Sequence, residues 1–136
     1  MNEPSVIRAM LAAKTIAVVG LSENPAKASF GVSRTMQKQG YRILPVNPAA
    51  QEVLGETSYA SLAELVAAEG KPDVVNVFRL PKFIPAIVDE MIALGLNNLW
   101  VQLGIVNDEA AAKAEAAGIR VVMDRCIMIE QAGNRV

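Results

Sequence analysis

The sequence predicts an α/β protein built on a Rossmann-like, doubly wound parallel sheet of about five to six strands with helices on both faces. Short β-branched segments alternate along the 136 residues with segments of helical periodicity. The first strand-like segment, TIAVVG (15–20), is a continuous β-branched run that ends in glycine, which is typical of a strand buried on both faces. No repeat, low-complexity tract or linker interrupts the chain, so we expect residues 1–136 to form a single domain.

The elements follow from these periods and from residues that typically begin or end a helix. Strands are expected at 15–20, 41–46, a short third segment within 51–59, 73–78, 98–103 and 119–123. Helices are expected at 5–13, about 30–39, about 62–68, 81–94, and from Asn107 to Gly118. Ser5, Ser29, Ser61 and Asn107 stand where caps are needed, and Glu64 completes a capping box with Ser61.

The strand order expected for such a chain is 3-2-1-4-5-6. Ligands of these sheets bind at the carboxyl ends of the strands, near the switch between the first and fourth strands. Four segments therefore matter for function, and they are residues 20–31, 46–49, 78–82 and 102–105.

Composition excludes several functional classes. Lys and Arg number 13 against 14 Asp and Glu, so no broad basic surface for nucleic acid is expected. Histidine is absent, which removes His-based acid–base chemistry, Ser-His and Cys-His nucleophiles, phosphohistidine and most zinc sites. The one cysteine, Cys126, excludes an intrachain disulfide and favours a structural thiol. With no signal-peptide core and no apolar run of about 18 residues, we expect a cytoplasmic protein that does not span a membrane.

The loop after the first strand lies where nucleotide-binding sheets hold phosphate. It is not G-x-G-x-x-G, because Ser22 stands in place of the second glycine and the loop is longer. Gly20 permits a tight turn, Ser22 and Ser29 offer hydroxyl groups, and Lys27 adds a positive charge. The following helix offers free N–H groups to an anion. The alternative is an ordinary strand-to-helix loop.

The turn after the second strand distinguishes between nucleotides. Sheets that bind NAD place an acidic residue there for the ribose hydroxyls, whereas residues 42–51 contain none. A nucleotide with a phosphate on its ribose suits such a turn, since a carboxylate would repel it. Asn47 offers a neutral donor and acceptor, and Pro48 stiffens the turn. For NADP, Arg42 or Lys27 is the expected partner of the 2′-phosphate. A plain turn is the alternative.

The segment after the fourth strand brings two cations to the switch point, Arg79 and Lys82. Phe78 is placed to stack on a base or line the crevice, and Pro81 suits a first helical turn. The alternative makes Phe78 a core residue and the two cations solvated charges. Gln102 and Gly104, after the fifth strand, are equally well explained as a buried amide and a turn glycine.

Together these segments resemble the CoA-binding domain family of small Rossmann-like proteins, which are similar to the N-terminal domain of the succinyl-CoA synthetase α subunit. The matching pieces cover nearly the whole chain after the first helix and include IAVVGLSENPAKASFG (16–31), YRILPVNP (41–48), PDVVNVFRLP (72–81) and VVMDRC (121–126). The resemblance implies a CoA or acyl-CoA pocket formed by Gly20, Ser22, Lys27, Ser29, Val46, Asn47, Pro48, Phe78, Arg79, Pro81 and Lys82.

The chain departs from the synthetases in one respect that bears on function. They carry a phosphorylated histidine in a further domain, and this sequence has neither. We therefore expect a stand-alone module that binds CoA without catalysis, with a protein partner left open. Two alternatives remain. One is an enzyme, either a small NADP-dependent oxidoreductase or a CoA-dependent transferase subunit that needs a partner chain. The other is a regulatory protein that has lost its ligand.

Overall fold

Five strands form one parallel sheet in the computed structural model, which describes residues 1–134. The sheet order is β2-β1-β5-β6-β7, and every neighbouring pair is parallel. The strands are β1 (Thr15–Val19), β2 (Arg42–Val46), β5 (Val74–Val77), β6 (Asn98–Val101) and β7 (Arg120–Met123). All four residues of β5 are buried, as expected for a strand in a parallel sheet covered on both sides.

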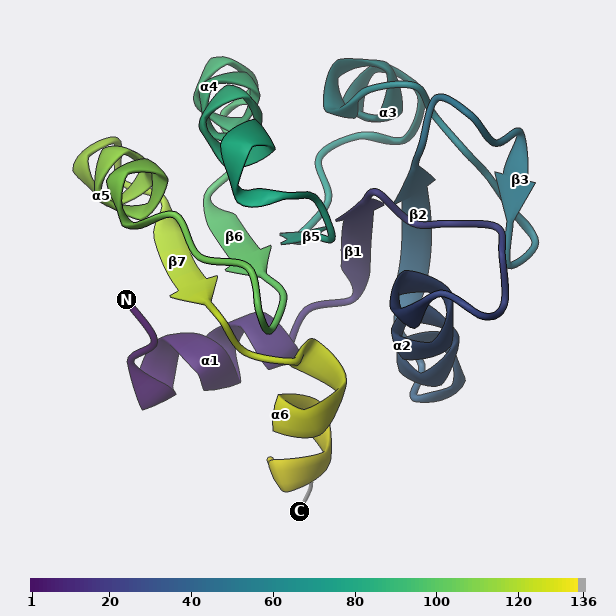
Figure 1. The fold of residues 1–136 in the computed structure, drawn as a ribbon, viewed down its shortest axis with the longest axis horizontal. Helices are drawn as coiled ribbons and strands as arrows, with labels where there is room; N and C mark the ends of the chain where they lie inside the picture. The colour runs from purple at the N-terminus through teal and green to yellow at the C-terminus, as the bar shows by residue number, and fades with distance from the viewer. Residues whose placement is uncertain (135–136) are drawn as a thin grey trace.

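Helices cover both faces of this sheet, so the Rossmann-like α/β fold is confirmed (Figure 1). One face carries α3 (Leu62–Glu69), α4 (Ile84–Leu94) and α5 (Asp108–Ala116). The other carries α1 (Pro4–Leu11), α2 (Ala28–Lys38) and α6 (Ile127–Gly133). Two apolar cores result, one on each side, and the fully buried Trp100 belongs to the second. No helix among residues 1–134 combines the length and apolarity needed to cross a membrane.

Two predicted helix caps are confirmed. Ser61 Oγ accepts a hydrogen bond of 3.1 Å from the Glu64 N–H, and the Glu64 carboxylate accepts one from the Ala60 N–H. The Ser61 cap is thus as expected, but the predicted capping box is incomplete, because the Glu64 carboxylate binds the N–H of Ala60, one residue before the cap, and not that of Ser61. Asn107 Oδ1 caps α5 in the same way, at 2.9 Å from the Ala110 nitrogen.

The predicted third strand is wrong as a member of the main sheet. The segment folds back on itself as a separate antiparallel hairpin of β3 (Glu52–Val53) and β4 (Glu56–Thr57). Leu54 and Gly55 at its turn both have positive φ, which reverses the chain after only two residues. Only a single bridge, between Tyr59 and Val46, occupies the place of the third strand beside β2.

Helix starts differ from the prediction where proline intervenes. The α1 helix begins at Pro4 with Glu3 before it and no side-chain cap, so the predicted Ser5 cap is wrong. The segment predicted as one helix from Pro81 is a 3₁₀ turn, η1 (Pro81–Phe83), followed by α4. Pro85 has no N–H with which to reach the Pro81 carbonyl, so the α-helical bond cannot form there. The C-terminal α6 was not predicted.

Candidate functional site

Three segments meet at Gly20, at the carboxyl edge of the sheet. The Gly20 N–H donates to the Val46 carbonyl at 2.9 Å, and the Phe78 N–H donates to the Val19 carbonyl at 2.9 Å. Gly20 has φ +86°, and a Cβ atom built on it would fall within 3.0 Å of the Phe78 carbonyl oxygen. Only glycine fits this position, because a side chain would be strained and would meet main-chain atoms. The tight turn predicted at Gly20 is therefore confirmed.

The loop after β1 is held by its own side chains. The Ser22 N–H donates to Ser29 Oγ at 3.0 Å, and Ser22 Oγ accepts from the Asn24 N–H at 3.0 Å. Asn24 in turn accepts from the Ala26 N–H at 3.0 Å. Both serine oxygens thus order the loop through backbone hydrogen bonds, a role that their placement in the sequence did not predict.

The N-terminus of α2 opens beside this loop. Helix α2 begins at Ala28 with Lys27 before it, so the prediction that Ser29 caps the helix is wrong. Ser29 lies buried in the first turn instead. Within the part of the chain that the structure describes, the Ala28 and Ser29 N–H groups have no hydrogen-bond acceptor. Two free N–H groups, the positive end of an 11-residue helix and the exposed Lys27 therefore lie together.

Asn47 ties the turn after β2 to the loop after β1. Its Nδ2 donates to the Leu21 carbonyl at 2.9 Å, and its Oδ1 accepts from the Ala49 N–H at 2.9 Å. The Asn47 amide thus holds the site's framework. Val46, which ends β2, is buried, whereas Pro48 at the turn is exposed to solvent.

Arg79 stacks on an aromatic ring that sequence reasoning missed. The Arg79 guanidinium carbon lies 4.1 Å from the centre of the Phe83 ring, and the Lys82 ammonium lies 5.2 Å from it. Among residues 1–134, neither cation nor Lys27 forms a salt bridge. The sequence held one signal for this contact, because Phe83 follows Arg79 by four positions where a helix was expected to begin.

A cavity of about 400 Å³ opens next to Arg79, between the turn after β5 and the loop after β6. Its lining includes Phe78, Leu80, Phe83 and Ile105. Its volume lies within the range of roughly 300–1,000 Å³ that small-molecule sites occupy. Gln102 does not line it. That side chain is buried and accepts a hydrogen bond of 3.3 Å from the Ile127 N–H, as expected of a satisfied buried amide.

Arg42, expected to meet the 2′-phosphate of NADP, lies at the opposite edge of the sheet. It is the first residue of β2, and it forms salt bridges with Glu56 at 3.1 Å and Glu69 at 3.0 Å. The Tyr59 hydroxyl also binds Glu69, and this hydrogen bond raises the pKa of Tyr59. The prediction for Arg42 is wrong because its side chain is engaged where the strand begins, away from the switch point.

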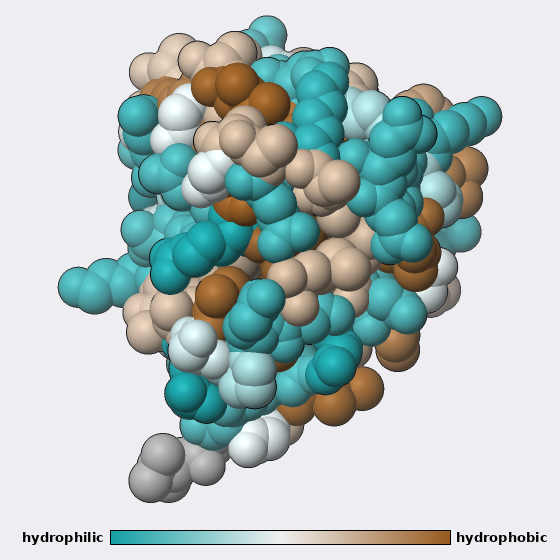
Figure 2. Space-filling model, turned by 90° about the vertical axis from the view of Figure 1, so that its left-hand side faces the viewer, coloured by the Kyte–Doolittle hydropathy of each residue, from teal (hydrophilic) through white to brown (hydrophobic). Residues whose placement is uncertain are grey.

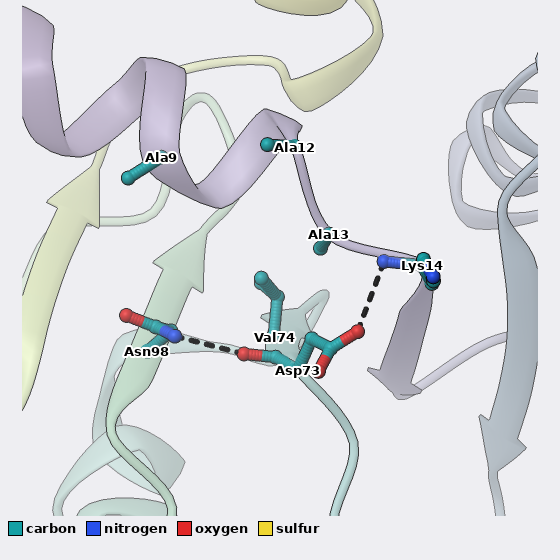
Figure 3. A pocket seen from close by; sticks show the side chains of 7 residues that line it. All are labelled: Ala9, Ala12, Ala13, Lys14, Asp73, Val74 and Asn98. Carbon is teal, nitrogen blue, oxygen red and sulfur yellow. Dashed lines mark hydrogen bonds between the residues drawn. The ribbon is translucent and has the colours of Figure 1, made fainter.

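A second hollow of about 330 Å³ lies at the amino ends of the strands (Figure 3). The Asp73 carboxylate there accepts hydrogen bonds from the N–H groups of Lys14 at 2.9 Å and Thr15 at 3.1 Å. These bonds lower the pKa of Asp73. The Asn98 amide donates to the Asp73 carbonyl, again at 2.9 Å. These hydrogen bonds link the amino ends of β1, β5 and β6. Because the polar groups named here already bind one another, they offer few donors or acceptors to a ligand.

Other parts of the described chain were compared with this edge of the sheet as possible sites. Figure 2 shows the face beside β7 and α5, where brown apolar residues are separated by teal hydrophilic ones. Within residues 1–134 there is no group of three or more His, Cys, Asp or Glu side chains placed to hold a metal ion. Cys126 is buried, in agreement with the structural thiol that the sequence indicates. The carboxyl edge of the sheet is thus the strongest candidate site.

Comparison with known proteins gives matches over most of the chain. Residues 14–132 match the family model described as "CoA binding domain". The chain is 42% identical over 119 residues to the uncharacterized protein YneT of Bacillus subtilis, covering 88% of this chain and 86% of that protein. It is 26% identical to the ADP-forming acetate–CoA ligase II subunit alpha of Pyrococcus furiosus, covering 84% of this chain but only 27% of the ligase subunit.

Solved structures agree with the fold. The structure of cell-free ID.343 from Thermus thermophilus superposes with a TM-score of 0.85 at 40% identity, covering 96% of this chain and 98% of that one. A hypothetical protein from Pyrococcus horikoshii superposes with a TM-score of 0.86 at 35% identity, covering 95% of this chain and 89% of that one.

Proposed function

Because the chain belongs to the family of CoA-binding domains, we propose that it binds CoA or an acyl-CoA at the carboxyl edge of its sheet. The observation that carries the proposal is the convergence of three segments around Gly20, beside an open helix N-terminus and cations that have no carboxylate partner among residues 1–134. In this proposal the chain is a binding module without a reaction of its own.

The phosphates of the ligand are proposed to lie at the start of α2. The Ala28 and Ser29 N–H groups, which have no acceptor among the described residues, lie at the positive end of the helix, the arrangement that binds anions at helix N-termini. Lys27 stands at the same end, and Arg79 approaches from the neighbouring turn, where its stem packs against Gly20. The ordering of this loop by Ser22 reduces the entropy lost when a ligand binds.

The adenosine end is proposed to lie at the turn after β2. Residues 42–51 hold no acidic side chain, so a phosphate on the ribose meets no repulsion from this segment. Pro48 is exposed there, and Asn47 holds the turn against the loop after β1. The pantetheine arm then runs past Phe78 and Arg79 along the end of β5, with Pro81 and Lys82 at the next turn.

A role within a larger assembly extends this proposal. The Pyrococcus relative is a subunit of a ligase, and this chain spans about a quarter of its length. Since the chain lacks histidine altogether, a reaction that passes through a phosphohistidine needs another chain to supply that residue. A transferase subunit with a partner chain therefore remains the second candidate.

The test is calorimetric titration of the protein with CoA, acetyl-CoA, NAD and NADP, together with an Arg79→Ala variant. We expect saturable binding of CoA and none of NAD. Loss of the Arg79 side chain is expected to weaken CoA binding by about 1.5–3 kcal/mol, a rise in Kd of roughly 10- to 150-fold, as for other charge-assisted hydrogen bonds.

The matched control is Arg120→Ala, which removes the same side chain from the amino end of β7. It is expected to leave CoA affinity unchanged. Absence of binding to all four nucleotides would refute the proposal, and tighter binding of NADP than of CoA would favour the oxidoreductase instead. Wild-type affinity in Arg79→Ala would remove Arg79 from the site.

A further inference from the structure

The cavity beside Arg79 is lined largely by apolar side chains. Phe78, Leu80 and Phe83 come from the end of β5 and the turn after it, and Ile105 faces them from the loop after β6. The one charged group in its lining, the Arg79 guanidinium, stacks on the Phe83 ring at 4.1 Å. Such a lining suits a hydrocarbon group, since apolar surface is favourably transferred from water to it.

The two walls of the cavity are fixed to each other and to the fold. Asn107 donates through Nδ2 to the Pro81 carbonyl at 3.0 Å, which links the loop after β6 to the turn after β5. Asp124, at the end of β7, accepts from the Gly104 N–H at 2.7 Å through Oδ1 and holds the far wall. A cavity held in this way exists before the ligand arrives, so little ordering is needed on binding.

Apolar side chains are also exposed on the two chain segments that line this cavity, residues 78–83 and the loop around Gly104 and Ile105. Leu80 is 63% exposed, Leu103 56% and Val106 45%. With Phe83 they make four of the seven large hydrophobic residues that are exposed among those the structure describes. Exposed apolar side chains concentrated on the segments that line one cavity are typical of a binding site.

We propose that this cavity holds the acyl chain of the ligand, so that the protein selects apolar acyl-CoA over free CoA. The inference rests on the proposed function, because it assumes that the pantetheine arm leaves the phosphate site along the end of β5. Phe78 and Arg79, which the arm passes in that proposal, both line the cavity. An acyl chain at the end of the arm would then cover Leu80, Phe83 and Ile105.

The test is a titration series with free CoA, acetyl-CoA, butyryl-CoA, hexanoyl-CoA and succinyl-CoA. Each buried methylene is worth about a fourfold gain in affinity, so butyryl-CoA is expected to bind up to about 15-fold more tightly than acetyl-CoA. Succinyl-CoA has a chain of similar length that ends in a carboxylate, and it is expected to bind more weakly than butyryl-CoA.

A cavity-filling variant locates the effect. Ile105→Phe is expected to reduce the ratio of hexanoyl-CoA to CoA affinity at least about tenfold, by occupying space that the chain needs. Ile92→Phe, on the exposed side of α4 and outside the cavity, is the matched control and should keep the wild-type ratio. Leu80→Ala, at an exposed position that folding tolerates, should lower the same ratio several-fold.

The outcomes separate this inference from the proposed function. Equal affinity for CoA and for all the acyl-CoA forms would overturn the acyl site and leave CoA binding intact. Tighter binding of succinyl-CoA than of butyryl-CoA would show that Arg79 recognises a carboxylate, and it would overturn the apolar assignment. A chain-length gain that Ile105→Phe leaves unchanged would place the acyl chain elsewhere. No binding of any form would refute both proposals.

Discussion

Replacement of Gly20 by alanine tests the geometry on which the whole site depends. Gly20 has φ +86°, a conformation that costs an L-residue about 1–2 kcal/mol. Alanine also restricts the unfolded chain, which offsets about 0.4–1 kcal/mol of that strain. The new Cβ would in addition fall within 3.0 Å of the Phe78 carbonyl oxygen, a main-chain atom that cannot rotate away. Overpacking of this kind costs about 1–3 kcal/mol more.

Two other glycines separate these contributions. Gly118 has the same φ of +86° with no atom within 4 Å of a built Cβ, so Gly118→Ala carries the strain without the collision. Gly31 lies inside α2 with open space around it, and Gly31→Ala should stabilise the protein by about 0.5–1 kcal/mol. We expect Gly118→Ala to lose about 1 kcal/mol and Gly20→Ala about 2–4 kcal/mol.

Urea denaturation measures these differences as shifts of the midpoint at constant slope. In thermal unfolding the expected loss for Gly20→Ala is on the order of 6–16 °C, taking about 3–4 °C per kcal/mol for a chain of this size. CoA affinity should fall as well, because the new Cβ would displace the turn after β5, which carries Arg79. Equal stability of Gly20→Ala and Gly118→Ala would show that the contact with Phe78 is not restrictive, and the argument for a required glycine would fail.

Two further substitutions test hydrogen bonds that stabilise the two edges of the sheet, Asn47 at the carboxyl edge and Asp73 at the amino edge. Asn47→Ala removes the hydrogen bond to the Leu21 carbonyl, so we expect the free energy of unfolding measured with urea to fall by about 1–2 kcal/mol. We also expect weaker CoA binding in calorimetry. Unchanged CoA affinity would show that this hydrogen bond does not support the site. For Asp73, whose pKa is lowered mainly by the N–H groups of Lys14 and Thr15, the carboxylate contributes stability above its ordinary pKa, and this is lost as pH falls through the lowered value. Wild type should therefore exceed Asp73→Asn in stability by a constant amount at pH 6–8, with the gap closing toward pH 3; a gap independent of pH would contradict this.

Local patterns in the sequence were sufficient for the fold class and for most element positions. Apolar runs such as Thr15–Val19 identify buried strands because both faces must be covered, whatever covers them. The caps at Ser61 and Asn107 were predictable because their hydrogen bonds reach only three residues along the chain. The Ser29 cap was wrong because the loop before α2 uses that hydroxyl to hold Ser22.

The candidate site was predictable in its segments but not in its contacts. The strand order places the loop after β1 beside the turn after β5, so Gly20 and Arg79 lie at the same edge of the sheet. Phe83 was missed because its part in the site depends on its stacking with the Arg79 guanidinium, which only the folded structure shows. Arg42 was misplaced because a residue's position within a strand decides which edge of the sheet it reaches.

Sequence patterns thus determine properties that depend on neighbours along the chain, namely the period of most elements and several of their ends. Properties that depend on distant segments required the folded structure. These are the separate hairpin of β3 and β4, the close approach of Gly20 to Phe78, and the cavity whose walls Asn107 and Asp124 hold in place. The physical reason is that these contacts join residues far apart along the chain, so they depend on which strands pair and which loops meet, and no local pattern encodes that.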